Sequence, residues 1–93
     1  MQHNYTVSDF RRDLRDGQHV WPGGYPRFFI TSDGAALSFE AARDNVRLVL
    51  EALRDDLRDG WQVVECSINW EDPGLFCDHT GFQIVPAYEA ERI

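Results

Sequence analysis

The chain contains no lysine and only two cysteines, Cys66 and Cys77, among its 93 residues. Two cysteines are too few for a disulfide framework, so we expect both thiols to be free. No apolar run approaches the roughly 18 residues that cross a bilayer, and the first residues lack the basic and apolar regions of a signal peptide. We therefore expect a cytoplasmic protein with no membrane partner.

Motifs that identify common enzymes and metal proteins are also missing. No serine has a histidine and an aspartate arranged with it as a triad, and Gly23 and Gly24 lie between two prolines, as in a turn. Structural zinc sites commonly use closely spaced pairs of cysteine or histidine, and the spacing of Cys77 and His79 does not fit such a pair. We expect no enzyme activity, no catalytic residue, no metal site and no cofactor.

Acidic residues outnumber arginines, and the excess is confined to the last third of the chain. The net charge is −7, from sixteen acidic residues and nine arginines. The stretch through Arg58 is nearly balanced, whereas the segment from residue 59 to residue 91 contains no arginine. The acids of that segment are the candidate partner-binding residues: Asp59, Glu65, Glu71, Asp72, Asp78, Glu89 and Glu91.

A surface with charge of one sign selects its partners. Negative charge repels nucleic acid and attracts basic surfaces, so we expect a monomer that binds a basic protein surface and makes no direct contact with nucleic acid. The alternative is that the acids only keep a small protein in solution.

The apolar pattern predicts a single α+β domain over residues 1–93, in which an antiparallel sheet packs on one long amphipathic helix. The long helix is predicted over residues 39–58 from a period of about 3.6 residues in its apolar positions. Those positions are Phe39, Ala42, Val46, Val49, Leu50, Leu53 and Leu57. A short N-terminal helix is predicted over residues 8–16, with Ser8 as its cap and Gly17 as its stop.

Strands are predicted at residues 27–32 and 35–37, joined by a turn at Asp33 and Gly34. Residues 61–70 alternate, which predicts one face on the core and the other in water. The expected core face is Val64, Cys66, Ile68 and Trp70, and the expected water face is Glu65, Ser67 and Asn69. Short strands at 75–78 and 82–86 complete the prediction, and Trp21 and Tyr25 are expected to be aromatic anchors.

Several motifs between Val20 and Tyr88 resemble those of small proteins of phages and other mobile elements. They are the strings WPGGYP, INWED and CDHTG. In the usual pattern of those proteins, two C-x-x-C pairs look like a zinc ribbon. This chain has Ser38 and Ala41 at the first pair and Thr80 at the last cysteine, so that only Cys77 remains. One thiolate does not hold a tetrahedral zinc ion, and the resemblance implies a retained fold that has lost its metal.

The chain is also similar to type I anti-CRISPR proteins, which are small acidic inhibitors of host defence. This resemblance implies an acidic DNA mimic that occupies the nucleic-acid groove of a CRISPR effector complex. The acids from Asp59 onward are then the binding surface. The alternative is a degenerate zinc-ribbon-like protein of a mobile element with a structural or regulatory interaction role.

Overall fold

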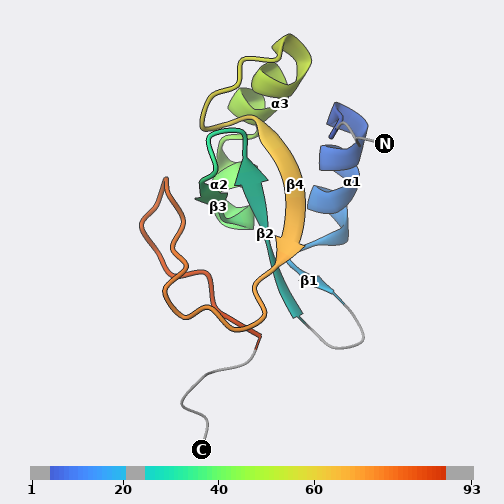
Figure 1. Cartoon of the computed structure of the whole chain (residues 1–93). Helices are drawn as coiled ribbons and strands as arrows, with labels where there is room; N and C mark the ends of the chain where they lie inside the picture. The colour runs from blue at the N-terminus through green and yellow to red at the C-terminus, as the bar shows by residue number, and fades with distance from the viewer. Residues whose placement is uncertain (1–4, 21–24, 88–93) are drawn as a thin grey trace, which may run out of the picture.

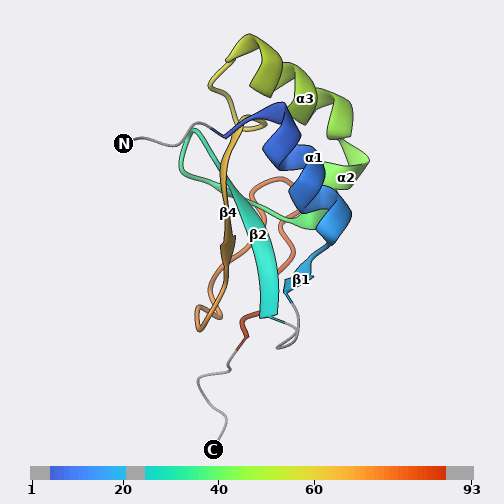
Figure 2. The same cartoon turned by 90° about the vertical axis from the view of Figure 1, so that its right-hand side faces the viewer.

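Helices cover one face of a small antiparallel sheet in the computed structural model, which describes residues 5–20 and 25–87 (Figure 1, Figure 2). The elements are α1 (Val7–Asp16), β1 (His19–Val20), β2 (Tyr25–Thr31), β3 (Ala36–Leu37), α2 (Phe39–Asp44), α3 (Val46–Asp55) and β4 (Val63–Ile68). The predicted α+β class and antiparallel sheet are confirmed. Within the described stretches, no helix has both the length and the apolar character needed to cross a membrane.

The central strand is β2, which pairs antiparallel with each of the other strands. Its residue Phe29 lies opposite Leu37 of β3 on one side and opposite Cys66 of β4 on the other. The predicted hairpin between β2 and β3 is present, and Gly34 supplies the positive φ of 85° that its turn requires. This register places β4 along one edge of β2 and leaves the other edge to β1 and β3.

Three phenylalanines attach the helices to the sheet: Phe39 stacks on Phe29, and Phe10 packs against Phe29 at an interplanar angle of 53°. The Phe29 ring centroid lies 5.3 Å from that of Phe10 in α1 and 4.3 Å from that of Phe39 in α2. All three side chains are fully buried. The stack places both helices on the same face of β2, and Figure 2 shows the helices together on one side of the sheet.

A half-buried arginine also ties α1 to β2. The Arg27 guanidinium donates to the main-chain oxygens of Gly17 (2.6 Å) and Asp13 (2.9 Å) at the end of α1, and it lies 3.5 Å from the Asp13 carboxylate. The Tyr5 hydroxyl donates to the same carboxylate. Burial, followed by this hydrogen bond to Asp13, raises the pKa of Tyr5. The sequence pattern did not reveal that Asp13 is buried.

The long helix predicted over residues 39–58 is wrong, because α2 and α3 are separate helices that meet at Asn45. Asn45 has ψ of 37°, and its side-chain amide donates to the Ala41 carbonyl at 3.0 Å. An asparagine side chain that bonds to nearby backbone competes with helix continuation. Buried apolar residues continue on both sides of the break, at Ala42 and Val49. The 3.6-residue period of apolar positions therefore did not reveal the break.

The predicted end of the second helical region and the predicted cap of the first helix also differ from the structure. The α3 helix ends at Asp55, and Asp56 follows in the left-handed region with φ of 52°. Leu57, predicted as buried, is therefore 48% exposed. At the other helix, Thr6 rather than Ser8 is the cap, and it exchanges hydrogen bonds with Asp9 in a capping box.

A bulge at the start of β4 corrects the predicted alternation. Glu65 pairs with Ile30, but the next pair joins Val63 to Thr31, so Val64 is an extra residue. As a result Val63 is fully buried and Val64 is 41% exposed. Glu65 is exposed as predicted, and Cys66 packs against the core as predicted.

The predicted faces of Asn69 and Trp70 are reversed, because the chain leaves the sheet after Ile68. Asn69 is 3% exposed, whereas Trp70 is 47% exposed. The Trp70 ring packs against Tyr25 at a tilt of 55° with centroids 4.9 Å apart. The predicted anchor Trp21 lies outside the described residues.

Residues 75–78 and 82–86 do not form the predicted strands and share a single bridge between Phe76 and Gln83. The predicted turn between them is present, with the Gly81 N–H donating to the Cys77 carbonyl at 2.8 Å. The Asp78 N–H donates to the Ala36 carbonyl at 2.8 Å, so this turn lies beside β3 (Figure 1).

Replacement of Phe29 by alanine should lower the free energy of unfolding by about 3–5 kcal/mol, because it removes the centre of the aromatic stack. Phe82, which is 69% exposed, provides a matched control. Phe82→Ala should cost less than about 1 kcal/mol. Urea denaturation of both variants measures the difference, and equal losses would show that the stack does not organise the core.

Candidate partner-binding surface

The acids of the arginine-free segment are placed on the turns and on β4. Glu65 is exposed on β4, Glu71 and Asp72 are exposed on the turn after it, and Asp78 is exposed on the turn beside β3. We call these four residues the arginine-free surface. The candidates Glu89 and Glu91 lie outside the described residues.

Asp59 differs from the other candidates because it is half-buried and bonded within its own turn. Its carboxylate accepts from the Trp61 N–H at 2.9 Å. Its main-chain oxygen accepts from the Ser32 hydroxyl at 3.1 Å, which joins this turn to the hairpin between β2 and β3. Asp59 therefore has a structural role besides its charge.

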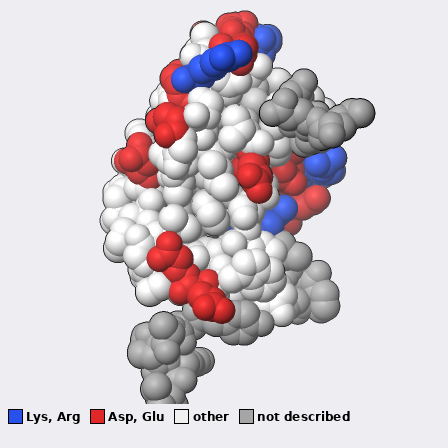
Figure 3. Space-filling view, viewed as in Figure 1, with Lys and Arg blue, Asp and Glu red and all other residues white. Residues whose placement is uncertain are grey.

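The arginines gather on the helical layer. Six of them lie on the three helices: Arg11, Arg12, Arg15, Arg43, Arg47 and Arg54. In Figure 3 blue atoms occupy the top and the right-hand side, whereas the left and lower parts of this face show only red among the white. The lower left of this face therefore shows acids without arginines, whereas the top and the right show charges of both signs.

Asn69 holds the turn that carries Glu71 and Asp72. Its amide donates to the main-chain oxygens of Asp72 (3.0 Å) and Ile84 (2.7 Å), and its side-chain oxygen accepts from the Asp72 N–H at 3.1 Å. The Asp72 carboxylate in turn accepts from the Gly74 N–H at 2.9 Å. The spacing of Asn69 and Asp72 before a Pro-Gly pair was the available signal for this turn.

Exposed apolar side chains lie before and after the same turn in the chain. Trp70 is 47% exposed, Phe76 is 53% exposed and Val85 is 56% exposed. Phe76 forms a bridge with Gln83, and Val85 lies two residues after Gln83 in the same segment. Sequence reasoning missed these residues because it assigned them to half-buried strands. Aromatic residues are enriched at protein interfaces, so this group adds contact area beside the carboxylates.

Cys77 lies in a small polar cluster between the turn that ends at Gly81 and the start of α2. Its sulfur accepts from the Ser38 N–H at 3.4 Å, and Cys77 is only 1% exposed. Burial raises the pKa of the thiol, but hydrogen bonds from Thr80 and Ser38 outweigh burial and lower the pKa to about 7. In contrast, burial dominates at Cys66 and raises its pKa to about 11.

Within residues 5–20 and 25–87, no three histidine, cysteine or acidic side chains are grouped as metal ligands would be. Comparisons of the chain with models of protein families, with curated proteins and with solved structures found no match. The function is therefore inferred from the surface of this chain.

The lowered pKa of Cys77 predicts that stability rises with pH above about 7. The folded thiol ionises near pH 7 and the unfolded thiol near pH 9, so the folded state binds fewer protons in this window. The contribution is fully present above the unfolded pKa and is lost as the pH falls through the folded pKa.

Between pH 7 and 8.5 the parent should therefore gain about 1–2 kcal/mol relative to Cys77→Ala. Urea denaturation at several pH values measures this gain. Cys66→Ala is the control and should keep the parental rise, because the pKa of Cys66 lies above the window. Parallel profiles for the parent and Cys77→Ala would contradict the assigned hydrogen bonds.

Proposed function

We propose that the protein binds a basic protein surface through its arginine-free surface, and that the partner is a type I CRISPR effector complex. The observation that carries this proposal is the placement of Glu71, Asp72 and Asp78 on exposed turns outside the arginine-bearing helices. Glu65 is exposed on β4, where it lines a pocket with Arg12 of α1 and with Arg27. CRISPR effectors hold nucleic acid in positively charged channels. Carboxylates can replace phosphates there, because both accept charge-assisted hydrogen bonds from arginine.

Two features favour specific binding over a solubilising coat. Asn69 holds the turn of Glu71 and Asp72 with three hydrogen bonds, so these acids are presented on ordered backbone. Ordered groups lose less entropy when they bind. The exposed Trp70 and Phe76 next to the acids provide apolar contact that a solubilising coat does not need.

Charge reversal tests the proposal. Glu65→Lys with Glu71→Lys changes two exposed acids for which no hydrogen bond or ion pair is present among the described residues. The pair should weaken binding to a purified type I effector complex by at least about tenfold, because complementary charge governs both encounter and register. Competition with target DNA for the effector complex measures the effect. The parent should block DNA binding by the complex, and this block should weaken as the salt concentration rises.

The matched control carries the same charge change on the helical layer, as Asp44→Lys with Glu51→Lys. It should bind within about twofold of the parent, and both double variants should unfold within about 1 kcal/mol of it. If the Glu65 and Glu71 reversal inhibits as well as the parent does, the acids are a solubilising coat.

The second candidate function, a degenerate zinc-ribbon-like protein with a structural or regulatory interaction role, is supported by the cluster at Cys77. The residues at the other positions of the resembled cysteine pairs lie around this sulfur. Ser38 and Thr80 both hydrogen-bond to Cys77. The Ala41 N–H donates to the Ser38 hydroxyl at 3.0 Å, which places Ala41 in the first turn of α2 beside the cluster.

Restoring the three cysteines should therefore create a metal site. A variant with Ser38→Cys, Ala41→Cys and Thr80→Cys should bind one zinc ion and show thiolate absorption with cobalt, whereas the parent should show neither. The same three changes combined with Cys77→Ala are the control and should bind metal far more weakly. A triple variant that gains no cobalt absorption would argue against a zinc-ribbon ancestry.

A further inference from the structure

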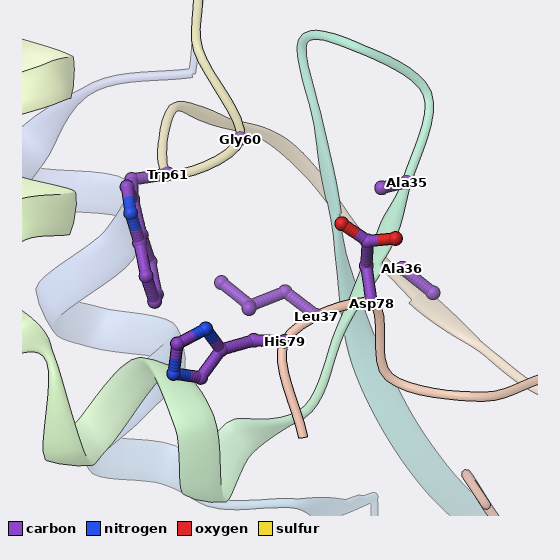
Figure 4. Close-up of a pocket in the computed structure, with 7 residues that line it drawn as sticks. All are labelled: Ala35, Ala36, Leu37, Gly60, Trp61, Asp78 and His79. Atoms are coloured by element: carbon purple, nitrogen blue, oxygen red, sulfur yellow. The ribbon is translucent and has the colours of Figure 1, made fainter. Parts of the chain in front are cut away.

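A pocket of about 170 Å³ opens between β3 and the turns on either side of it (Figure 4). Trp61 stands on one side of the pocket and Asp78 on the other, with Leu37 and His79 between them. Gly60 and Ala35 lie at the upper rim in this view. The pocket is large enough for the head of one side chain and too small for a nucleotide.

The two opposing walls are held in place by contacts outside the cavity. The Trp61 N–H donates to the Asp59 carboxylate at 2.9 Å, and the Trp61 ring meets the His79 ring edge-on with centroids 4.6 Å apart. The Asp78 main chain is bonded to Ala36 of β3. Among the described residues, no hydrogen bond or ion pair occupies the Asp78 carboxylate, so it is available to a ligand.

The surroundings of the pocket are negative. Asp33 uses one carboxylate oxygen to accept from the Thr31 hydroxyl and the Ala35 N–H. Its other oxygen lies 3.4 Å from the place that a Gly60 Cβ would take, which puts it at the rim. None of the described arginines lines the pocket. An aromatic ring and an unpaired carboxylate, with further acids nearby, are the groups that recognise a cation.

We infer that this pocket binds one arginine side chain of the basic partner, with the guanidinium stacked on Trp61 and hydrogen-bonded to Asp78. Arginine fits better than lysine because its planar head can stack on a ring and bond to a carboxylate in two places at once. The inference rests on the proposed function, because the basic partner supplies the arginine. It assigns to Asp78 a defined recognition role among the acids of the arginine-free surface.

Titration of the full chain with N-acetyl-arginine amide tests the pocket without any partner protein. Proton–nitrogen NMR follows the Trp61 indole, which the Trp61→Phe spectrum identifies among the three tryptophans. We expect a saturable shift of the Trp61 signal. The citrulline analogue has the same shape without the charge and should cause no such shift. An equal shift with citrulline, or no shift with arginine, would overturn the inference.

Two acid-to-amide variants locate the carboxylate that binds. Asp78→Asn should weaken the arginine titration at least fivefold, whereas Asp44→Asn, which removes one exposed charge on α2 outside the pocket, should stay within twofold of the parent. Asp78→Asn keeps the main-chain bond to Ala36, so the fold should persist, and its unaltered remaining NMR signals would show this. Equal weakening by both variants would mean that only net charge matters.

The outcomes separate this inference from the proposed function. Absence of the arginine-specific shift rejects the pocket, while the reversal of Glu65 and Glu71 still decides whether the surface binds a basic partner. An arginine-specific shift together with unimpaired inhibition by that reversed pair would keep the pocket and reject the larger acidic surface.

Discussion

The packing of Phe29 against Phe10 and Phe39 is the contact on which the rest of the structure depends. The same residue pairs with β3 and β4, so it joins the sheet to two helices. Because the helices take this face, the side chains of the neighbouring positions, such as Glu65 opposite Ile30, point to the other face. The core contact thereby fixes the helical layer, which carries six of the nine arginines, on one face of β2.

Asn69 has a comparable role for the candidate surface. Its main-chain N–H donates to Pro26 at 3.2 Å and its carbonyl accepts from Ala87 at 2.7 Å, while its side chain holds the turn between them. A fully bonded buried amide rigidifies the backbone around it. The acids of this turn therefore start from ordered backbone.

Local interactions account for the predictions that are confirmed. The hairpin at Asp33 and Gly34, the stop of α1 at Gly17 and the turn ending at Gly81 follow from residue types that act within a few positions. The break at Asn45 and the bulge at Val64 were not predictable in the same way. Apolar period and strand alternation run through both features. The first pattern is interrupted by the bond from the Asn45 side chain to the Ala41 carbonyl, and the second by the shifted pairing of β4 with β2.

The sequence by itself determined the class of the fold, its turns and the separation of charge along the chain, because these depend on composition and short-range geometry. Only the tertiary structure decided which polar groups are buried and which residues meet. It buried Asn69, exposed Trp70, and brought Trp61 to His79 and Asp78 across β3. These outcomes depend on contacts between residues far apart in the chain, and single-residue preferences carry no information about such contacts.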